Sequence, residues 1–332
     1  MGVALTIIAI VLSGAAGVAA ERRWPASAVW WARRALVFSL YTLIPFVVFF
    51  NLARVEIDAD LGGGLVIGWV AILTAAGIAW LVGERLLRLD RPATGALITG
   101  TLVPNSGYLG YPLVASLLGF DALGEAVVYD IAVPAPSLLL LGFATGAAFG
   151  TRAGEGFRER MIAFFTRNPP LYAAIAALLA PDSLAPDLLV DISRGVVVAL
   201  LPIGFFAVGA VLAGEVEEIR GRADDPRAPD SATRDTPKAR PVSSRLGSPL
   251  DPPVGAAILL RLLVAPGLLL LLSLPFIDLP GPYLLIAAMP CGINTLVVAH
   301  VYGLDVKLAA QAVAWTTAIA VTGALTAEAI WG

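Results

Sequence analysis

Apolar residues along this chain come in long uninterrupted blocks, with no alternation between apolar and polar positions inside them. Each block is about 20 residues long, the length that an α-helix needs to cross a hydrocarbon core roughly 30 Å thick. Peptide groups in lipid find no water to bond, so only helices or closed barrels span a bilayer, and barrel strands would alternate apolar and polar residues. The pattern therefore predicts an all-α polytopic membrane protein.

Counting the apolar blocks predicts ten transmembrane helices. Their expected ranges are 2–20, 29–51, 62–84, 93–119, 123–148, 168–186, 190–213, 254–276, 281–302 and 306–331. The first block has no positive segment before it, and Arg22 and Arg23 follow it, which favours a retained helix over a cleaved signal peptide. The sixth block opens with a helix-starting Asn-Pro-Pro sequence at 168–170 and meets Pro181 near its far end.

The basic residues support this count because they collect on one side of the predicted membrane. Of the 22 lysines and arginines, 19 fall in the connections that follow the odd-numbered spans or in the first two turns of the next span. Positive residues favour the cytoplasmic side, so we expect both termini to face outside the cell membrane. The long polar stretch 215–253 is rich in Pro, Asp, Arg and Ser, and we expect it to be a disordered cytoplasmic loop.

Composition narrows the classes of function. Hydrophobic residues make up 58% of the chain, charged residues only 14%, and the mean hydropathy is +0.84. With one cysteine, Cys291, and one histidine, His300, the chain cannot form an intrachain disulfide and is short of ligands for a zinc site. A nucleotide-binding loop is also missing from the sequence. We therefore expect no enzyme activity, no cofactor and no nucleic-acid partner.

Two of the predicted spans are interrupted near their middle by proline, glycine and asparagine. The fourth span contains LVPNSG at 102–107, and the ninth contains MPCGIN at 289–294. Proline removes a backbone donor and glycine loosens the backbone, so such a break is expensive in lipid unless it is buried in protein or lines a polar cavity. A single break would suggest a packing kink, whereas two at matched places indicate function.

The two interrupted spans occupy equivalent places in the chain. Each is the fourth of five, and they end on Gly119 and Gly303, each followed two residues later by aspartate. Because five is odd, two five-helix halves have opposite topology, which predicts the inverted repeat of many secondary transporters. We expect a first repeat at 1–150, helices six and seven at 151–214, the loop at 215–253 and helices eight to ten at 254–332.

The breaks also predict where a substrate would bind. Each one creates a helix N-terminus near the bilayer centre, whose unpaired N–H groups attract a carboxylate. The expected substrate-binding residues flank the two breaks: Pro104, Asn105, Ser106, Gly107, Pro290, Gly292, Ile293 and Asn294.

At these breaks the chain resembles the auxin efflux carrier family, which includes the plant PIN-formed carriers and bacterial relatives. LVPN at 102–105 with GYPL at 110–113 is similar to the family's fourth helix, and MPCGI at 289–293 with VAHVY at 298–302 is similar to its ninth. NPP at 168–170 and RLLVAP at 261–266 are similar to the starts of its sixth and eighth helices. The likeness extends over nearly the whole chain.

This resemblance implies a fold shared with the bile acid, arsenite and riboflavin transporter superfamily. It implies a scaffold of helices 1, 2, 6 and 7 and a transport domain of helices 3–5 and 8–10, with broken, crossing helices 4 and 9. It further implies elevator-like movement, a homodimer, and carboxylate substrates such as auxin, malate or malonate.

Four polar residues inside predicted spans are candidates for coupling or gating, since ionisable groups in a membrane are costly and usually functional or paired. Asp130 could carry a coupling proton, bind a cation or face an outer vestibule. Arg261 could neutralise a substrate carboxylate or snorkel to the membrane surface. His300 could relay protons or simply end a helix in a polar environment. Gln311 could face the site.

We therefore expect a secondary transporter for a small organic anion, with proton or sodium coupling left open. A channel or a membrane receptor on the same fold is the alternative. An intramembrane protease would need a catalytic dyad or a zinc cluster, and Asp130 and His300 are isolated in the sequence.

Overall fold

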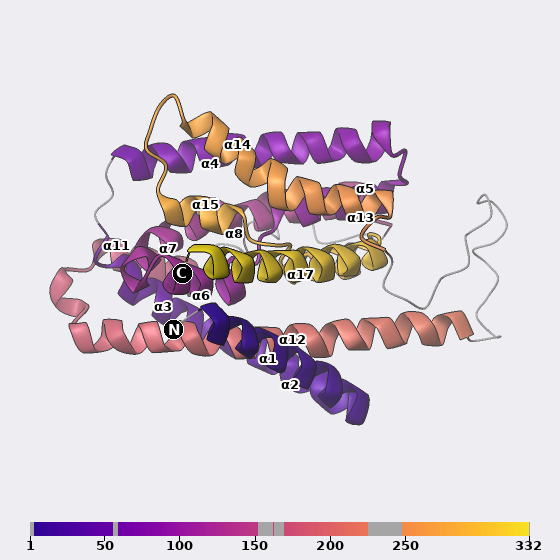
Figure 1. Ribbon diagram of the computed structural model, residues 1–332, viewed down its shortest axis with the longest axis horizontal. Coiled ribbons are helices and arrows are strands. Elements are labelled where there is room, and N and C mark those ends of the chain that lie inside the picture. The colour runs from indigo at the N-terminus through magenta and orange to yellow at the C-terminus, as the bar shows by residue number, and fades with distance from the viewer. Residues whose placement is uncertain (1–2, 56–58, 152–161, 163–168, 225–247, 332) are drawn as a thin grey trace.

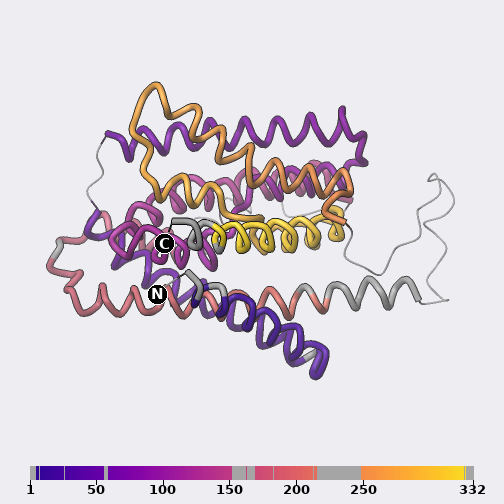
Figure 2. Tube along the Cα trace, in the orientation of Figure 1, coloured from indigo at the N-terminus to yellow at the C-terminus, as the bar shows by residue number. Residues whose placement is uncertain are grey.

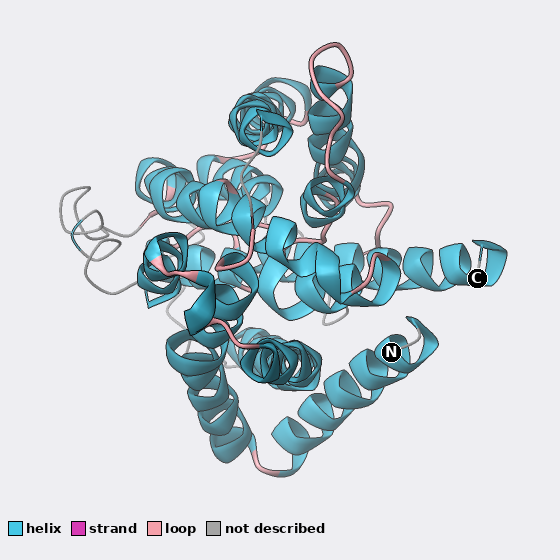
Figure 3. Ribbon diagram, turned by 90° about the vertical axis from the view of Figure 1, so that its left-hand side faces the viewer, coloured by secondary structure: helices cyan, strands magenta, loops and turns pink. Residues whose placement is uncertain are grey.

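The structure is a computed structural model that describes the chain apart from residues 1–2, 56–58, 152–161, 163–168, 225–247 and 332 (Figure 1). Its described elements are helices, in agreement with the predicted all-α fold (Figure 3). Five helices among the described residues are long and apolar enough to cross a membrane: Ser27–Leu52, Ala59–Leu86, Phe120–Phe149, Asp187–Val211 and Pro252–Ser273.

The helices of residues 1–150 follow the predicted spans closely, and η denotes a short π-helical or 3₁₀ segment. They are α1 (Val3–Arg23), α2 (Pro25–Phe38), η1 (Ser39–Leu43), α3 (Ile44–Leu52), α4 (Ala59–Leu81), η2 (Val82–Leu86), α5 (Arg91–Leu102), η3 (Ser106–Gly110), α6 (Tyr111–Leu117), η4 (Phe120–Ala122), α7 (Leu123–Ala132), α8 (Pro134–Ser137), η5 (Leu138–Gly142) and α9 (Phe143–Phe149).

The remaining helices belong to the second half of the chain. They are α11 (Pro169–Leu179), η6 (Asp182–Leu184), α12 (Asp187–Asp224), α13 (Pro252–Leu259), η8 (Leu260–Val264), α14 (Ala265–Ser273), α15 (Gly281–Ala287), α16 (Asn294–Tyr302) and α17 (Val306–Trp331).

The two predicted interruptions are confirmed. One helix stops at Leu102 and resumes at Ser106, and the other stops at Ala287 and resumes at Asn294. The glycines expected to end these spans, Gly119 and Gly303, both have positive φ, at 93° and 68°. A residue with a side chain is strained in that conformation, so glycine is favoured where each helix ends.

Two predicted boundaries differ from the structure. The sixth helix ends at Leu179, seven residues before the expected 186, because Pro181 cannot continue a helix. Helix α12 runs to Asp224, ten residues into the stretch 215–253 that we expected to be disordered. Glutamate and arginine make up five of those ten residues and are good helix formers. Positions 225–247 of that stretch lie outside the described residues.

The helices pack in two groups (Figures 1 and 2). In the first group, α12 packs along α1, α2 and α3, and α11 packs on α3. In the second group, α4 packs on α5 and α14, α5 also contacts α9 and α17, and α13 packs on α17. A buried apolar cluster lies within the second group and runs from α5 to α17.

Small residues allow the helices of the first group to approach closely. A Cβ atom on Gly17 of α1 would lie 2.1 Å from the Phe206 carbonyl oxygen of α12, and one on Gly209 would lie 2.2 Å from the Gly14 carbonyl oxygen. Close backbone packing through small residues is a common way to join helices in lipid, where apolar burial gives little driving force.

The connections of the molecule lie at two ends in Figure 1. The α4–α5 turn, the end of α12 and the start of α13 lie at the right-hand end, which carries arginine-rich connections. The α11–α12 and α14–α15 turns lie at the left-hand end. Arg85, Arg88 and Arg91 lie between the end of α4 and the start of α5, so this part of the basic grouping inferred from the sequence lies at the right-hand end.

Candidate functional site

The two broken segments cross and bond to each other through their backbones. The Asn105 N–H donates to the Pro290 carbonyl at 2.8 Å, and the Gly292 N–H donates to the Val103 carbonyl at 2.7 Å. Together these bonds form an isolated antiparallel bridge between Pro104 and Cys291. The structure thus brings together two segments that lie almost 190 residues apart in sequence.

Each break leaves a backbone carbonyl without its usual helical donor. In a continuous helix Thr101 O would accept from the N–H of Asn105, and Ala287 O would accept from that of Cys291. At the crossing Asn105 bonds Pro290 instead, and the Cys291 N–H donates to Thr316 Oγ1 at 3.0 Å. Buried carbonyls without a partner are costly, so another donor is required.

Arg261 supplies that donor to both broken helices. Its Nη1 donates to Thr101 O at 2.7 Å, its Nη2 donates to Ala287 O, and its Nε donates to Met289 O at 2.7 Å. The side chain belongs to the π-helical segment η8 and is only 1% exposed. Arg261 therefore binds the carboxyl ends of α5 and α15 and does not snorkel to the membrane surface.

The crossing depends on a missing side chain at position 292. A Cβ atom on Gly292 would lie 2.7 Å from the Pro104 carbonyl oxygen and 3.1 Å from its carbonyl carbon. Those are backbone atoms held by the crossing itself, so they cannot move aside cheaply. Gly100 lies in α5, one turn before Pro104, and has room for a side chain. A Cβ atom on Gly100 would have the Cys291 sulfur as its nearest neighbour, at 3.6 Å.

The two asparagines predicted to bind substrate lie in different environments. Asn105 is 5% exposed, whereas Asn294 is exposed. The bonding pattern shows that the two asparagines are not equivalent. Asn105 and Gly292 are the two residues that donate across the crossing, and Val103 and Pro290 are the two that accept, so Gly292 occupies the position equivalent to Asn105. Asn294 therefore stands two residues beyond the position that corresponds to Asn105.

The other predicted binding residues surround the crossing. Ser106, Pro290, Gly292 and Ile293 are buried, and Pro104 and Gly107 are half-buried. Ser106 and Asn294 are the first residues of η3 and α16, so the two new helix N-termini begin at the crossing.

Asp130 contacts the broken helix from α7. Its carboxylate accepts a hydrogen bond from the Tyr111 hydroxyl at 2.7 Å, and it also interacts with the Ser106 side chain. Both partners follow the break at 104–105. Asp130 is half-buried, so the structure places this carboxylate next to the start of the second half of the broken helix.

The last two candidates, His300 and Gln311, differ in their exposure. His300 is exposed in the last turn of α16, and Gln311 of α17 is 7% exposed.

A small, mainly apolar pocket lies beside the crossing. It is bordered by Pro104 and Leu102 of the first broken segment, by Ala287 of the second, and by Tyr129 and Arg261. Arg261 therefore borders the same small cavity as Pro104.

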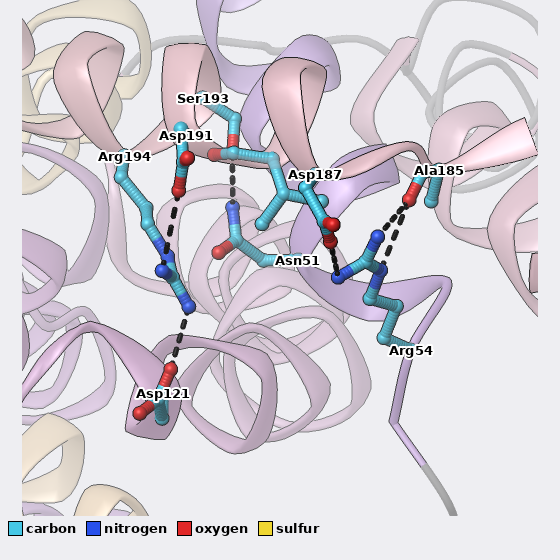
Figure 4. A network of polar contacts seen from close by, with 9 residues as sticks. Asn51, Arg54, Asp121, Ala185, Asp187, Asp191, Ser193 and Arg194 are labelled. Carbon is cyan, nitrogen blue, oxygen red and sulfur yellow. Dashed lines mark hydrogen bonds and ion pairs between the residues drawn. The ribbon is translucent and has the colours of Figure 1, made fainter.

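A second group of polar contacts lies where α3 meets the start of α12 (Figure 4). Arg54 bonds the Asp187 carboxylate at 2.8 Å and the Ala185 carbonyl, and Asn51 donates to Ser193 Oγ at 3.0 Å. Arg194 bonds Asp121 of η4 at 2.6 Å, which links the first helix group to the connection between α6 and α7.

Sequence reasoning missed three contributors to the site. Tyr111 and Thr316 are ordinary residues of apolar helices, and Thr101 contributes only its backbone carbonyl. Tyr111 could have been suspected, since it lies one turn beyond a proline–asparagine break. The roles of Thr101 and Thr316 depend on packing between distant helices, which leaves no local signal.

The chain is similar in sequence to known membrane transport proteins. Residues 166–325 match a family described as membrane transport proteins. An uncharacterized transporter of Methanocaldococcus jannaschii is 23% identical over 305 residues, covering 88% of this chain and 86% of that protein. An uncharacterized transporter of Methanothermobacter thermautotrophicus is 33% identical over 141 residues, covering 41% of this chain and 43% of that protein. The family match includes Arg261 and the second broken segment.

Proposed function

We propose that the chain is a member of the auxin efflux carrier family, which it resembles at both breaks, and that it is a secondary transporter of a small organic anion in the cell membrane. Its similarity to a family of membrane transport proteins and to archaeal transporters supports this proposal. The observation that carries the proposal is the crossing itself, where two broken helices bond to each other at Pro104 and Cys291. Interrupted helices at corresponding places are typical of substrate sites in secondary transporters.

The charge at the crossing favours an anion. The helix N-termini at Ser106 and Asn294 carry partial positive charge, and Arg261 adds a full positive charge close by. In the part of the chain that the structure describes, no carboxylate forms an ion pair with Arg261. A substrate carboxylate would lower the electrostatic cost of this buried cation, and we propose the predicted residues from Pro104 to Gly107 and from Pro290 to Asn294 as its contacts.

The two helix groups suggest how the site would move. We propose that α1, α2, α3, α11 and α12 form the scaffold, and that the remaining helices form a transport domain carrying the crossing. The ten spans would then form two inverted repeats with both termini outside, and the domain would slide as an elevator within a homodimer. Asp130 is the proposed proton carrier, since its carboxylate bonds the broken helix through Tyr111.

The test is uptake and counterflow of labelled malate, malonate, lactate and indole acetate in proteoliposomes, under imposed proton, sodium or voltage gradients. We expect saturable uptake with counterflow, lost in the Asn105→Ala plus Asn294→Ala double variant. The control is Asn51→Ala, which removes a buried amide from the α3–α12 contact and should lower stability without lowering uptake per folded protein.

Each outcome separates the candidate functions. Flux that saturates and exchanges across the membrane identifies a carrier, and flux that does neither identifies a channel. A folded, reconstituted protein that moves none of the carboxylates would contradict the organic-anion proposal.

A further inference from the structure

Three carbonyl oxygens converge at the crossing in a way that would suit a bound cation. Thr101 O lies in the last turn of α5, Ala287 O belongs to the last residue of α15, and Met289 O lies two residues beyond it. The carboxyl ends of helices carry partial negative charge, and in transporters with broken helices such ends and unwound carbonyls commonly coordinate a coupling ion. Here all three oxygens face the guanidinium group of Arg261.

The shape of the guanidinium group matches this arrangement. Its Nε, Nη1 and Nη2 atoms each donate to a different carbonyl, so one planar group satisfies both broken helices at once. A lysine ammonium is a compact point charge and could not donate to the three carbonyls in this planar arrangement. Arg261 is also attached to the chain, so its charge cannot leave the site when a substrate does.

We propose that Arg261 is a tethered cation that takes the place of a mobile coupling cation between the carboxyl ends of α5 and α15. It holds the two broken helices together in every step of the cycle, and the carrier consequently needs no sodium at the crossing. The transport part of this inference rests on the proposed function. The binding part concerns only the carbonyl oxygens of Thr101, Ala287 and Met289, and it can be tested without measuring transport.

The first experiment measures thermal unfolding of the purified full chain in detergent. Arg261→Ala removes the guanidinium group from between the three carbonyls, and we expect the Tm to fall. Guanidinium chloride should raise the Tm of this variant again, at concentrations well below those that denature proteins. Sodium chloride at the same ionic strength controls for screening. The matched variant Arg194→Ala removes an arginine from a partly exposed ion pair and should gain nothing from guanidinium.

The second experiment measures uptake in proteoliposomes. Arg261→Ala should lose about tenfold or more of the uptake, as expected when a charged hydrogen-bond donor is removed, and guanidinium should restore part of it. Wild-type uptake and wild-type Tm should be unchanged when sodium is replaced by N-methylglucamine.

The results separate this inference from the proposed function. A folded Arg261→Ala protein that gains no more Tm from guanidinium than Arg194→Ala does would overturn the tethered cation. Sodium-dependent uptake or sodium-dependent Tm in the wild type would overturn it too, and this holds even where Arg261→Ala fails to fold. A wild type that carries no carboxylate would defeat the proposed function, while the Tm comparison would still decide the inference.

Discussion

Arg261 and Arg194 are both arginines on helices of a membrane protein, yet their surroundings differ completely. Arg261 is 1% exposed and bonds three backbone carbonyls from two broken helices. The Arg194 side chain is 31% exposed and bonds the carboxylate of Asp121, which is 97% exposed. One arginine replaces missing helix hydrogen bonds in a buried site, and the other forms an ion pair that lies open to solvent.

The difference shows where polar side chains matter most to this fold. Ion pairs between exposed groups contribute little, because solvent screens them and the side chains lose freedom. Buried donors to otherwise unpaired carbonyls contribute more, because losing them leaves desolvated polar groups behind. We therefore expect substitutions at the crossing to have larger effects than those in the contact between α3 and α12.

The largest effect is expected for Arg261→Met. It removes the donor for three carbonyls while keeping a long apolar side chain, and we expect the free energy of unfolding to fall by about 3 kcal/mol. Unfolding of the purified protein in detergent measures this against Arg194→Met. Equal losses in the two variants would contradict the contrast between the sites.

Gly292→Ala should have the next largest effect. Its new methyl group would meet the Pro104 carbonyl, and forcing extra volume into packed backbone costs about 2 kcal/mol. We expect lower stability and lower uptake per folded protein. Gly100→Ala is the matched control, since its methyl group has room and alanine favours helix, so stability should stay the same or rise by about 0.5 kcal/mol. A tolerated Gly292→Ala would mean that the crossing is looser than the structure indicates.

A smaller effect is expected at the bond between Asp130 and Tyr111. Tyr111→Phe removes a 2.7 Å hydrogen bond, worth about 1 kcal/mol, and a double-mutant cycle with Asp130→Asn measures the coupling. If Asp130 carries the proton, Asp130→Asn should abolish the response of uptake to a proton gradient and spare counterflow. An unchanged response would assign proton coupling elsewhere.

The smallest effect is expected for Arg194→Ala. The loss of its ion pair with Asp121 should change the free energy of unfolding by no more than about 0.5 kcal/mol, and added salt should shrink the change further. A large, salt-insensitive loss would show that the α12–η4 contact acts as a structural link between the two helix groups.

Much of the helix pattern and both breaks were predictable from sequence. Apolar blocks specify helices in lipid, and proline with glycine inside a block specifies an interruption. Pro104 and Pro290 therefore predicted the positions of both breaks from the sequence. The limits of α11 and α12 were less predictable. Pro181 ended the first early, and helix-forming charged residues carried the second past the apolar block.

The partners across the crossing could not be predicted. The sequence treats Asn105 and Asn294 as equivalent, because both follow a proline in an interrupted span. In the structure Asn105 bonds Pro290 and Gly292 bonds Val103, so the residue whose N–H has the same role as that of Asn105 is Gly292 and not Asn294. Arg261 looked like a residue that could reach the membrane surface, and only the positions of Thr101, Ala287 and Met289 show where its charge is used.

The sequence by itself determined that this chain forms membrane helices, that two of them are broken, and that basic residues are concentrated in alternate connections along the chain. Those properties follow from local composition, because each peptide group and each charge placed in lipid has its own free-energy cost, whatever its distant neighbours are. The tertiary structure alone decided that the two breaks bond to each other and that Arg261 joins their carboxyl ends. Those contacts join residues as far as 190 positions apart, and only the packing of helices can select which buried donor meets which buried acceptor.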